Sequence, residues 1–398
     1  MSKALSWQRR ASTRISRGLS RRGMPRRLVL SASLFAAIIL APAIVETGVQ
    51  AQDGRIFRFI SPDCNDASCP GWQMLDNNPA SVRIAAVGDG SNTESRVYQL
   101  HNDGRIFRFT GQPCNGEFCP GWQMLDNNPA TIGIAAYSVV NGADQVFQLH
   151  KSGHVFRFTG TPCDGESCHG WETLDNNPGT LALATGEGAL YKLHKDGRIF
   201  QFTGPACNSV SCPGWQMLDN NPATVRIAAG SNRSLYQLHD DGRIFKFIGP
   251  PCNGESCPGW EMLDNNPATI GITAGVGFYQ LQNSGRIFRY LGTPCDGQSC
   301  LGWQMLDNNP ATIAIVGGNI HSKKRGAALY QMRDNGHIFR FTRTSCNDNG
   351  CPGWVMIDNN SNSGRLSYGS VSNSGLYKIH ADRLRMTRER TCAECRPH

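Results

Sequence analysis

Short runs of alternating apolar and polar residues recur along most of the chain. Between residues 80 and 128 the runs are "VRIAA" (82–86), "VYQLH" (97–101), "RIFRFT" (105–110) and "GWQMLD" (121–126). Alternation with a period of two, bounded by turn signals, predicts β-strands. "NDG" between the second and third runs predicts a tight hairpin, and "DNNP" ends the fourth because proline cannot donate to a strand ladder. Each unit therefore predicts four antiparallel strands.

This unit occurs seven times along the chain. A tryptophan marks the fourth run at positions 72, 122, 171, 215, 260, 303 and 354, at intervals of 43 to 51 residues. Repeats of this length with four strands each predict an all-β, seven-bladed β-propeller. The first run is rich in alanine and glycine, which suits the crowded strand nearest the axis. The tryptophan run is then outermost and packs between neighbouring blades.

The two ends of the repeat region complement each other. The first unit starts at "DGRIFRF" (53–59) without its first two strands, and the last ends with those two, "RLSYG" (365–369) and "LYKIH" (376–380). We therefore expect a propeller over 52–380 in which one blade is shared by both ends, which removes an exposed sheet edge. The remaining tail, 381–398, contains a degenerate third strand and Cys pair. It could fill that slot, pack beside it or be loose.

The first 51 residues have the pattern of an export signal. Basic residues precede the apolar run 28–45, and "VQA" (49–51) ends in small residues. This pattern predicts a signal peptide cleaved after Ala51, with Met24 as an alternative start. An uncleaved membrane anchor is the competing interpretation. The protein is then secreted or periplasmic, with no membrane span after cleavage.

The net charge of +8 comes from this segment. Nine of the 39 basic residues and one of the 31 acidic residues lie in 1–51, which leaves 30 of each sign. A nucleic-acid partner normally requires a basic surface. The neutral repeat region therefore argues against nucleic-acid binding.

Sixteen cysteines are present, and fourteen form C-x4-C pairs between the third and fourth runs. An export signal and a fixed local spacing predict one disulfide per unit, each contributing about 2 kcal/mol in the chain-entropy model. Metal binding is the alternative, but two thiols per loop, with one additional histidine (His169), fall short of four zinc ligands. Cys392 and Cys395 remain unassigned. The predicted disulfide residues are Cys64, Cys69, Cys114, Cys119, Cys163, Cys168, Cys207, Cys212, Cys252, Cys257, Cys295, Cys300, Cys346 and Cys351.

Because successive strands run in opposite directions, the loops between them are expected on two opposite faces of the propeller. The Cys loops and the variable insertions at 88–95, 137–144 and 317–327 are expected on one face, and the hairpins and "DNNP" turns on the other. Carboxylates, amides and a nearby indole suit sugar hydroxyls, and the oxygens also suit calcium. The competing interpretation is that Asp and Asn cap their own turns and that Trp packs the blades. The candidate ligand-binding residues are Trp72, Asp76, Asn77, Asn78, Trp122, Asp126, Asn127, Asn128, Asp175, Asn176, Asp219, Asn220, Asp264, Asn265, Asp307 and Asn308.

The "LYQLH" strand, the "DGRIF" strand and the Trp strand together resemble tectonin- and tachylectin-like propeller repeats. The resemblance covers residues 53–380. It implies a secreted or defence lectin that binds sugars at repeated sites between blades, without catalysis. The C-x4-C loop and the "LDNNPAT" turn depart from that pattern, so no binding residue is transferred by position.

The favoured function is therefore a secreted, multivalent carbohydrate-binding propeller whose partners are glycans or glycoconjugates. The alternative is a secreted or envelope protein-interaction scaffold that uses the Cys-loop face, where Lys323, Lys324 and Arg325 lie. A propeller hydrolase or lyase is less favoured, because no Gly-x-Ser-x-Gly, His-Glu-x-x-His or phosphate-loop motif is present. No catalytic residue, metal site or cofactor is predicted, apart from the calcium considered above.

Overall fold

The computed structural model describes residues 54–65, 68–88, 96–139, 144–254, 256–297, 299–318, 328–368 and 375–380. The predicted signal peptide, the tail with Cys392 and Cys395, and the Lys323–Arg325 cluster lie outside the described residues. Within them, the elements are strands and a single 3-10 turn, η1 (Ser231–Arg233). The predicted all-β class is confirmed.

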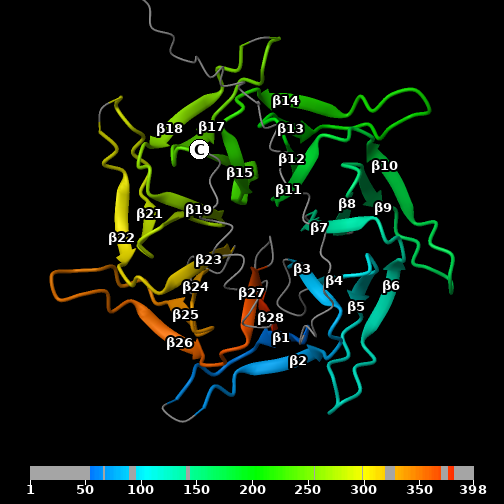
Figure 1. Ribbon diagram of the computed structural model, residues 1–398, viewed down its shortest axis with the longest axis horizontal. Coiled ribbons are helices and arrows are strands. Elements are labelled where there is room, and N and C mark those ends of the chain that lie inside the picture. The colour runs from blue at the N-terminus through cyan, green and yellow to red at the C-terminus, as the bar shows by residue number, and fades with distance from the viewer. Residues whose placement is uncertain are drawn as a thin grey trace, which may run out of the picture. The chain divides into compact units, whose positions relative to one another are not determined.

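The strands form seven four-stranded antiparallel sheets around a common centre (Figure 1). The first blade is β3 (Ser81–Val87), β4 (Arg96–His101), β5 (Ile106–Phe109) and β6 (Trp122–Asp126). The second is β7 (Thr131–Ser138), β8 (Asp144–His150), β9 (Val155–Phe158) and β10 (Trp171–Asp175). The third is β11 (Thr180–Gly186), β12 (Ala189–His194), β13 (Ile199–Phe202) and β14 (Trp215–Asp219). The fourth is β15 (Thr224–Ala229), β16 (Leu235–His239), β17 (Ile244–Phe247) and β18 (Trp260–Asp264).

The fifth blade is β19 (Thr269–Ala274), β20 (Phe278–Gln282), β21 (Ile287–Tyr290) and β22 (Trp303–Asp307). The sixth is β23 (Thr312–Gly318), β24 (Ala328–Arg333), β25 (Ile338–Phe341) and β26 (Trp354–Asp358). The closing blade joins both ends of the repeat region: β27 (Ser363–Tyr368), β28 (Leu376–His380), β1 (Ile56–Phe59) and β2 (Trp72–Asp76). In Figure 1 the red β27 and β28 lie beside the blue β1 and β2. The predicted closure is confirmed, with Ile56 opposite Ile379.

The hydrophobic core lies between adjacent blades. Leu100 and Ile106 of the first blade form one buried cluster with Val146 and Phe158 of the second, and Trp171 packs against it. The other clusters repeat this arrangement around the ring. The prediction that Trp packs between blades is confirmed.

The strands nearest the axis are the alanine- and glycine-rich runs, as predicted. Residues of all seven inner strands line a central cavity of about 300 Å³. Its polar side chains are few, and their hydroxyls join neighbouring blades: Thr185 donates to the Ala136 carbonyl, and Ser367 donates to the Ile84 carbonyl. The cavity is therefore framed by strand edges and small side chains.

The C-x4-C loops, here called Cys loops, cover the outer edge of the preceding blade. All seven predicted disulfides are formed. The N–H of Cys114 donates to the Met74 carbonyl at 3.2 Å, and the first cysteine of each other loop bonds in the same way. An uncovered strand edge would invite pairing with another chain. Each disulfide loop therefore closes an edge of its neighbour as well as bracing its own blade.

The predicted separation of the Cys loops from the "DNNP" turns does not hold at the rim. Asn77 Nδ2 donates to the Glu117 carbonyl at 2.6 Å, and Asn127 Nδ2 donates to the Glu166 carbonyl at 2.8 Å. Glu117 and Glu166 lie at the tips of Cys loops, whereas Asn77 and Asn127 lie in the turns of the preceding blades. Because these two loops run along the outer strand of the preceding blade, their tips reach the opposite face.

Candidate ligand sites at the blade junctions

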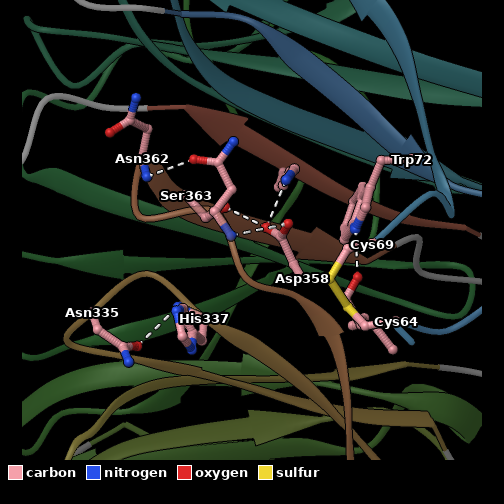
Figure 2. Close-up of polar contacts among 11 residues, drawn as sticks. Cys64, Cys69, Trp72, Asn335, His337, Asp358, Asn362 and Ser363 are labelled. Carbon is pink, nitrogen blue, oxygen red and sulfur yellow. Dashed lines mark hydrogen bonds and ion pairs between the residues drawn. A yellow bond between two sulfur atoms is a disulfide. The ribbon is translucent and has the colours of Figure 1, made fainter. Parts of the chain in front are cut away.

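The aspartate of each "DNNP" turn is buried at a junction between two blades. Figure 2 shows the junction between the sixth and the closing blade. Asp358 Oδ2 accepts hydrogen bonds from Ser363 Oγ at 2.5 Å and from Lys378 Nζ at 2.6 Å. Asp76 likewise accepts from Ser81 Oγ at 3.1 Å. These carboxylates bind the next blade, which gives them an architectural role.

Burial raises the pKa of five of these aspartates, and hydrogen bonds from the turn and from the next blade oppose the rise. For Asp76, desolvation is the largest cause, and the opposing donors include Ser81 and Gln99. The same direction and leading cause apply to Asp126, Asp219, Asp264 and Asp307. Each of these carboxylates is 3–5% exposed, so little of it faces solvent.

The two asparagines of the motif differ. The second caps its own turn: Asn78 Oδ1 accepts the Ala80 N–H, and Asn128 Oδ1 accepts the Ala130 N–H, both at 2.9 Å. The first is exposed in each predicted candidate: Asn77, Asn127, Asn176, Asn220, Asn265 and Asn308. Within the "DNN" set, the first asparagine therefore remains at the surface.

The tryptophans join the outer strands of successive blades. Trp72 Nε1 donates to the Ile357 carbonyl at 2.7 Å (Figure 2), and Trp122 Nε1 donates to the Leu75 carbonyl at 2.8 Å. The five later tryptophans make the equivalent bond. The Trp122 ring lies 5.2 Å from the Phe109 ring of the same blade and is half-buried. The indole N–H is engaged, while part of the ring stays accessible.

A polar pair on the third and fourth strands was missed by the sequence analysis. Arg108 and Gln123 are cross-strand neighbours, and Arg108 Nη2 donates to Gln123 Oε1 at 2.6 Å. Arg157 Nε similarly donates to Glu172 Oε1 at 2.6 Å. The sequence does contain a signal for this pair. The second arginine of "RIFRF" and the glutamine of "GWQML" alternate with the aromatic residues, so both lie on the other face of the sheet.

These polar pairs face the aromatic residues of the next blade. The Arg157 guanidinium carbon lies 6.0 Å from the Phe202 ring centre in the third blade. Burial is the main cause that raises the pKa of Tyr290 to about 12, and the nearby Glu261 of the preceding blade adds to it. At these two junctions, a charged pair of one blade therefore meets an aromatic residue of the next.

The strand-end histidines are buried beside phenylalanine. The His101 ring lies 4.5 Å from the Phe107 ring, and His101 is 2% exposed. Burial is the main cause that lowers the pKa of His101 to about 4, and it lowers the pKa of His194 to about 4 as well. Both imidazoles are neutral at pH 7 and belong to the packing of the fold.

Two buried lysines, Lys192 and Lys378, were also missed. Each occupies the position that glutamine holds in the other five blades and pairs with the "DNNP" aspartate of the preceding blade. Lys378 Nζ lies 4.4 Å from the Trp72 ring centre. Burial lowers the pKa of both lysines, while the paired aspartate opposes this change.

Within the part of the chain that the structure describes, no three or more His, Cys, Asp or Glu side chains converge as metal ligands would. No helix in those same residues has the length and apolar character needed to cross a bilayer.

No family model matches the chain, and no curated protein matches it in sequence. Solved structures do resemble it. Prp20p from Saccharomyces cerevisiae, described with its binding to Gsp1p and histones, is 12% identical with a TM-score of 0.53 over 87% of this chain and 96% of that one. Yeast RCC1 (Prp20) bound to Kap60 is 12% identical with a TM-score of 0.53, over 86% and 92% of the two chains. At this identity the likeness shows the fold alone, a β-propeller.

Proposed function

We propose that the protein is an exported, non-enzymatic propeller that binds carbohydrate at several equivalent blade junctions. One observation supports this proposal most. In five of the seven blades a basic side chain is the cross-strand neighbour of an amide or carboxylate, and strand alternation puts each pair on the sheet face toward the next blade. The pairs are Arg58 with Gln73, Arg108 with Gln123, Arg157 with Glu172, Lys246 with Glu261, and Arg289 with Gln304.

The chemistry of these junctions suits sugars. Guanidinium groups donate hydrogen bonds to neighbouring hydroxyls, and amide groups both donate to them and accept from them. A partly exposed aromatic ring offers an apolar surface to the C–H face of a pyranose. Several weak, equal sites on one rigid body gain avidity of about 10² to 10⁴ on a surface with repeated ligands, provided the geometry allows simultaneous contact. Repetition of the unit would then increase the total affinity for such a surface.

A glycan-array screen of the protein lacking residues 1–51 tests this proposal. We expect binding to one sugar class that the free monosaccharide competes away. Running the screen with and without calcium tests whether calcium contributes, since exposed asparagine oxygens are ligands that calcium accepts. A folded sample that binds no glycan would overturn the proposal.

Variants can then locate the site. Replacing Arg108 and Gln123 together with alanine should remove one site of the measured stoichiometry and leave the others. Arg105→Ala is the matched control, because Arg105 lies on the hairpin and its guanidinium pairs with Asp103 at 2.7 Å. If both variants keep the full stoichiometry, the sugar binds elsewhere.

A protein-interaction scaffold is the second candidate, and large apolar residues in and beside the Cys loops favour it. Phe118 is 68% exposed, Val210 is 89% exposed and Leu301 is 82% exposed. Large exposed apolar groups are enriched where proteins meet. If the glycan screen is negative, a binding assay that compares the unaltered protein with Phe118→Ser and Val210→Ser is the appropriate next test.

A further inference from the structure

Every inner strand begins with a β-bulge. The register shifts at Thr131/Gly133 in the second blade, and at the same place in each of the other six. At each bulge, one residue of the inner strand has no partner residue in the neighbouring strand. We call these the bulge residues: Val82, Ile132, Leu181, Val225, Ile270, Ile313 and Gly364. Six of the seven are large and aliphatic, although a bulge alone does not require an apolar residue.

The bulge residues of three consecutive blades are unusually exposed. Ile132 is 46% exposed, Leu181 is 49% exposed and Val225 is 45% exposed. By contrast, Val82, Ile270 and Ile313 pack against buried clusters. Bulges redirect side chains and are enriched beside functional sites. The inner strands β7, β11 and β15 contact one another in turn, so these three residues occupy the same position on three neighbouring strands, and we call them the arc.

Positive charge flanks this arc. Arg226 directly follows Val225, and Arg83 follows the bulge residue of β3, the inner strand before β7; both arginines are exposed. The first three residues of β3, β7, β11 and β15 include no carboxylate. The arc therefore has an exposed arginine near each end, and the exposed Asp240 of the neighbouring hairpin lies beside the Arg226 end, where its N–H donates to the Ala223 carbonyl.

A hollow lies at the Arg83 end of the arc. It has a volume of about 170 Å³ and is lined by Arg83 and Arg365 together with Ile84, Ile134, Leu366 and Ile379. Walls that are apolar except for Ser367, with two guanidinium groups, fit a ligand that carries an aliphatic side chain next to a carboxylate. A neutral sugar has no carboxylate, and a second copy of this surface would bring arginines against arginines.

We propose that this arc and hollow dock a peptide segment of a partner protein that carries aliphatic side chains and carboxylates. The aliphatic side chains lie over Ile132, Leu181 and Val225, and the carboxylates pair with the flanking arginines. This surface lies near the axis on the face of the "DNNP" turns. It is separate from the rim junctions and does not depend on the proposed carbohydrate binding.

A peptide array provides the probe. Immobilised hexapeptides combine Leu, Ile or Val with Asp, Glu, Lys or Ser, each with a free and an amidated C-terminus. We expect the purified chain to bind acidic aliphatic peptides and to bind their lysine counterparts at least tenfold more weakly. Binding should weaken as salt is raised, because exposed charge pairs are screened. No preference for acidic aliphatic peptides would overturn the proposal.

Surface variants connect binding to the arc. Leu181→Ser and Arg226→Ala should each weaken peptide binding about tenfold, since each removes one anchoring contact. Val276→Ser is the matched control, because Val276 is 49% exposed in the loop at the other end of an inner strand. Equal loss in Leu181→Ser and Val276→Ser, or no loss in Leu181→Ser, would refute the assignment. Thermal melting of each variant establishes that it folds. A dimer that sedimentation detects and Leu181→Ser abolishes would instead assign the arc to self-association and overturn the proposal.

Discussion

Lys192 offers the sharpest test of how the blades are held together. Its ammonium group is 3% exposed and pairs with the carboxylate of Asp175 on the preceding blade, which is 4% exposed. The ammonium also lies 4.3 Å from the Trp215 ring centre and 4.9 Å from the Phe200 ring centre. The aspartate retains a hydrogen bond from Thr180 Oγ1 at 3.1 Å. Lys192 therefore supplies the charge that compensates a buried carboxylate.

The remaining blades indicate which replacements this position accepts. Five of them carry glutamine here, as in Gln99 and Gln237, which accept from the serine or threonine that begins the inner strand at 2.6 to 2.7 Å. Lys192→Gln should therefore cost about 1 kcal/mol or less, because the amide can reproduce that network. Lys192→Met removes the charge and leaves Asp175 buried without its partner, which should cost about 3 to 5 kcal/mol.

Denaturant unfolding followed by tryptophan fluorescence, with the disulfides intact, measures both variants. The midpoints should fall in the order unaltered protein, Lys192→Gln, Lys192→Met, with unchanged slopes. The double variant Lys192→Met with Asp175→Asn is the control, because it removes the unpaired charge and should recover much of the loss. Equal destabilisation by glutamine and methionine would refute the argument that charge compensation is what this position needs.

Three further predictions concern the other repeated features. Because burial lowers the pKa of His101 to about 4, the unfolded chain takes up a proton below pH 6.5 before the folded one does. Stability should thus be fully present above pH 6.5 and fall by up to about 3 kcal/mol as the pH approaches 4. Replacing His101 with glutamine, the residue at Gln282 in the fifth blade, should remove this contribution from melting curves across the range, while His194 keeps its own. Replacing Cys114 and Cys119 with serine should lower the free energy of unfolding by about 2 kcal/mol; an unchanged midpoint would contradict a stabilising role for this disulfide. Gly121→Ala should destabilise by more than about 1 kcal/mol, because its Cβ would lie 2.0 Å from a backbone carbonyl oxygen; full stability would contradict that geometry.

The fold could be predicted from the sequence because its determinants are local and repeated. The period-two runs define the strands, and the complementary ends at residues 53–59 and 365–380 define the closing blade. The spacing of the cysteines defines the disulfides. None of these inferences needed to know how one blade is oriented against the next.

The site residues that were missed depend on that orientation. Nothing in a hexapeptide loop indicates that the Cys114 N–H reaches the Met74 carbonyl of another blade, so the loop tips were assigned to the wrong face. The sequence alternation predicts that Arg108 and Gln123 lie on the same side of their sheet. It does not predict which neighbouring blade that side faces, because this depends on the direction in which the ring closes. The burial of Asp76 is likewise a property of the junction, which the "DNNP" turn alone does not reveal.

Sevenfold repetition also gives the molecule an internal reference. A feature present in every blade, such as the Trp N–H bond or the buried turn aspartate, is needed wherever two blades meet and so belongs to the architecture. A feature confined to a few blades cannot be explained in that way, since its neighbours fold without it. Ile132, Leu181 and Val225 are exposed in adjacent blades, while Ile270 and Ile313 at the same position are packed. In other blades the same position is therefore packed without any partner. The joint exposure of these three side chains on neighbouring strands departs from the sevenfold symmetry, and a bound partner would account for it.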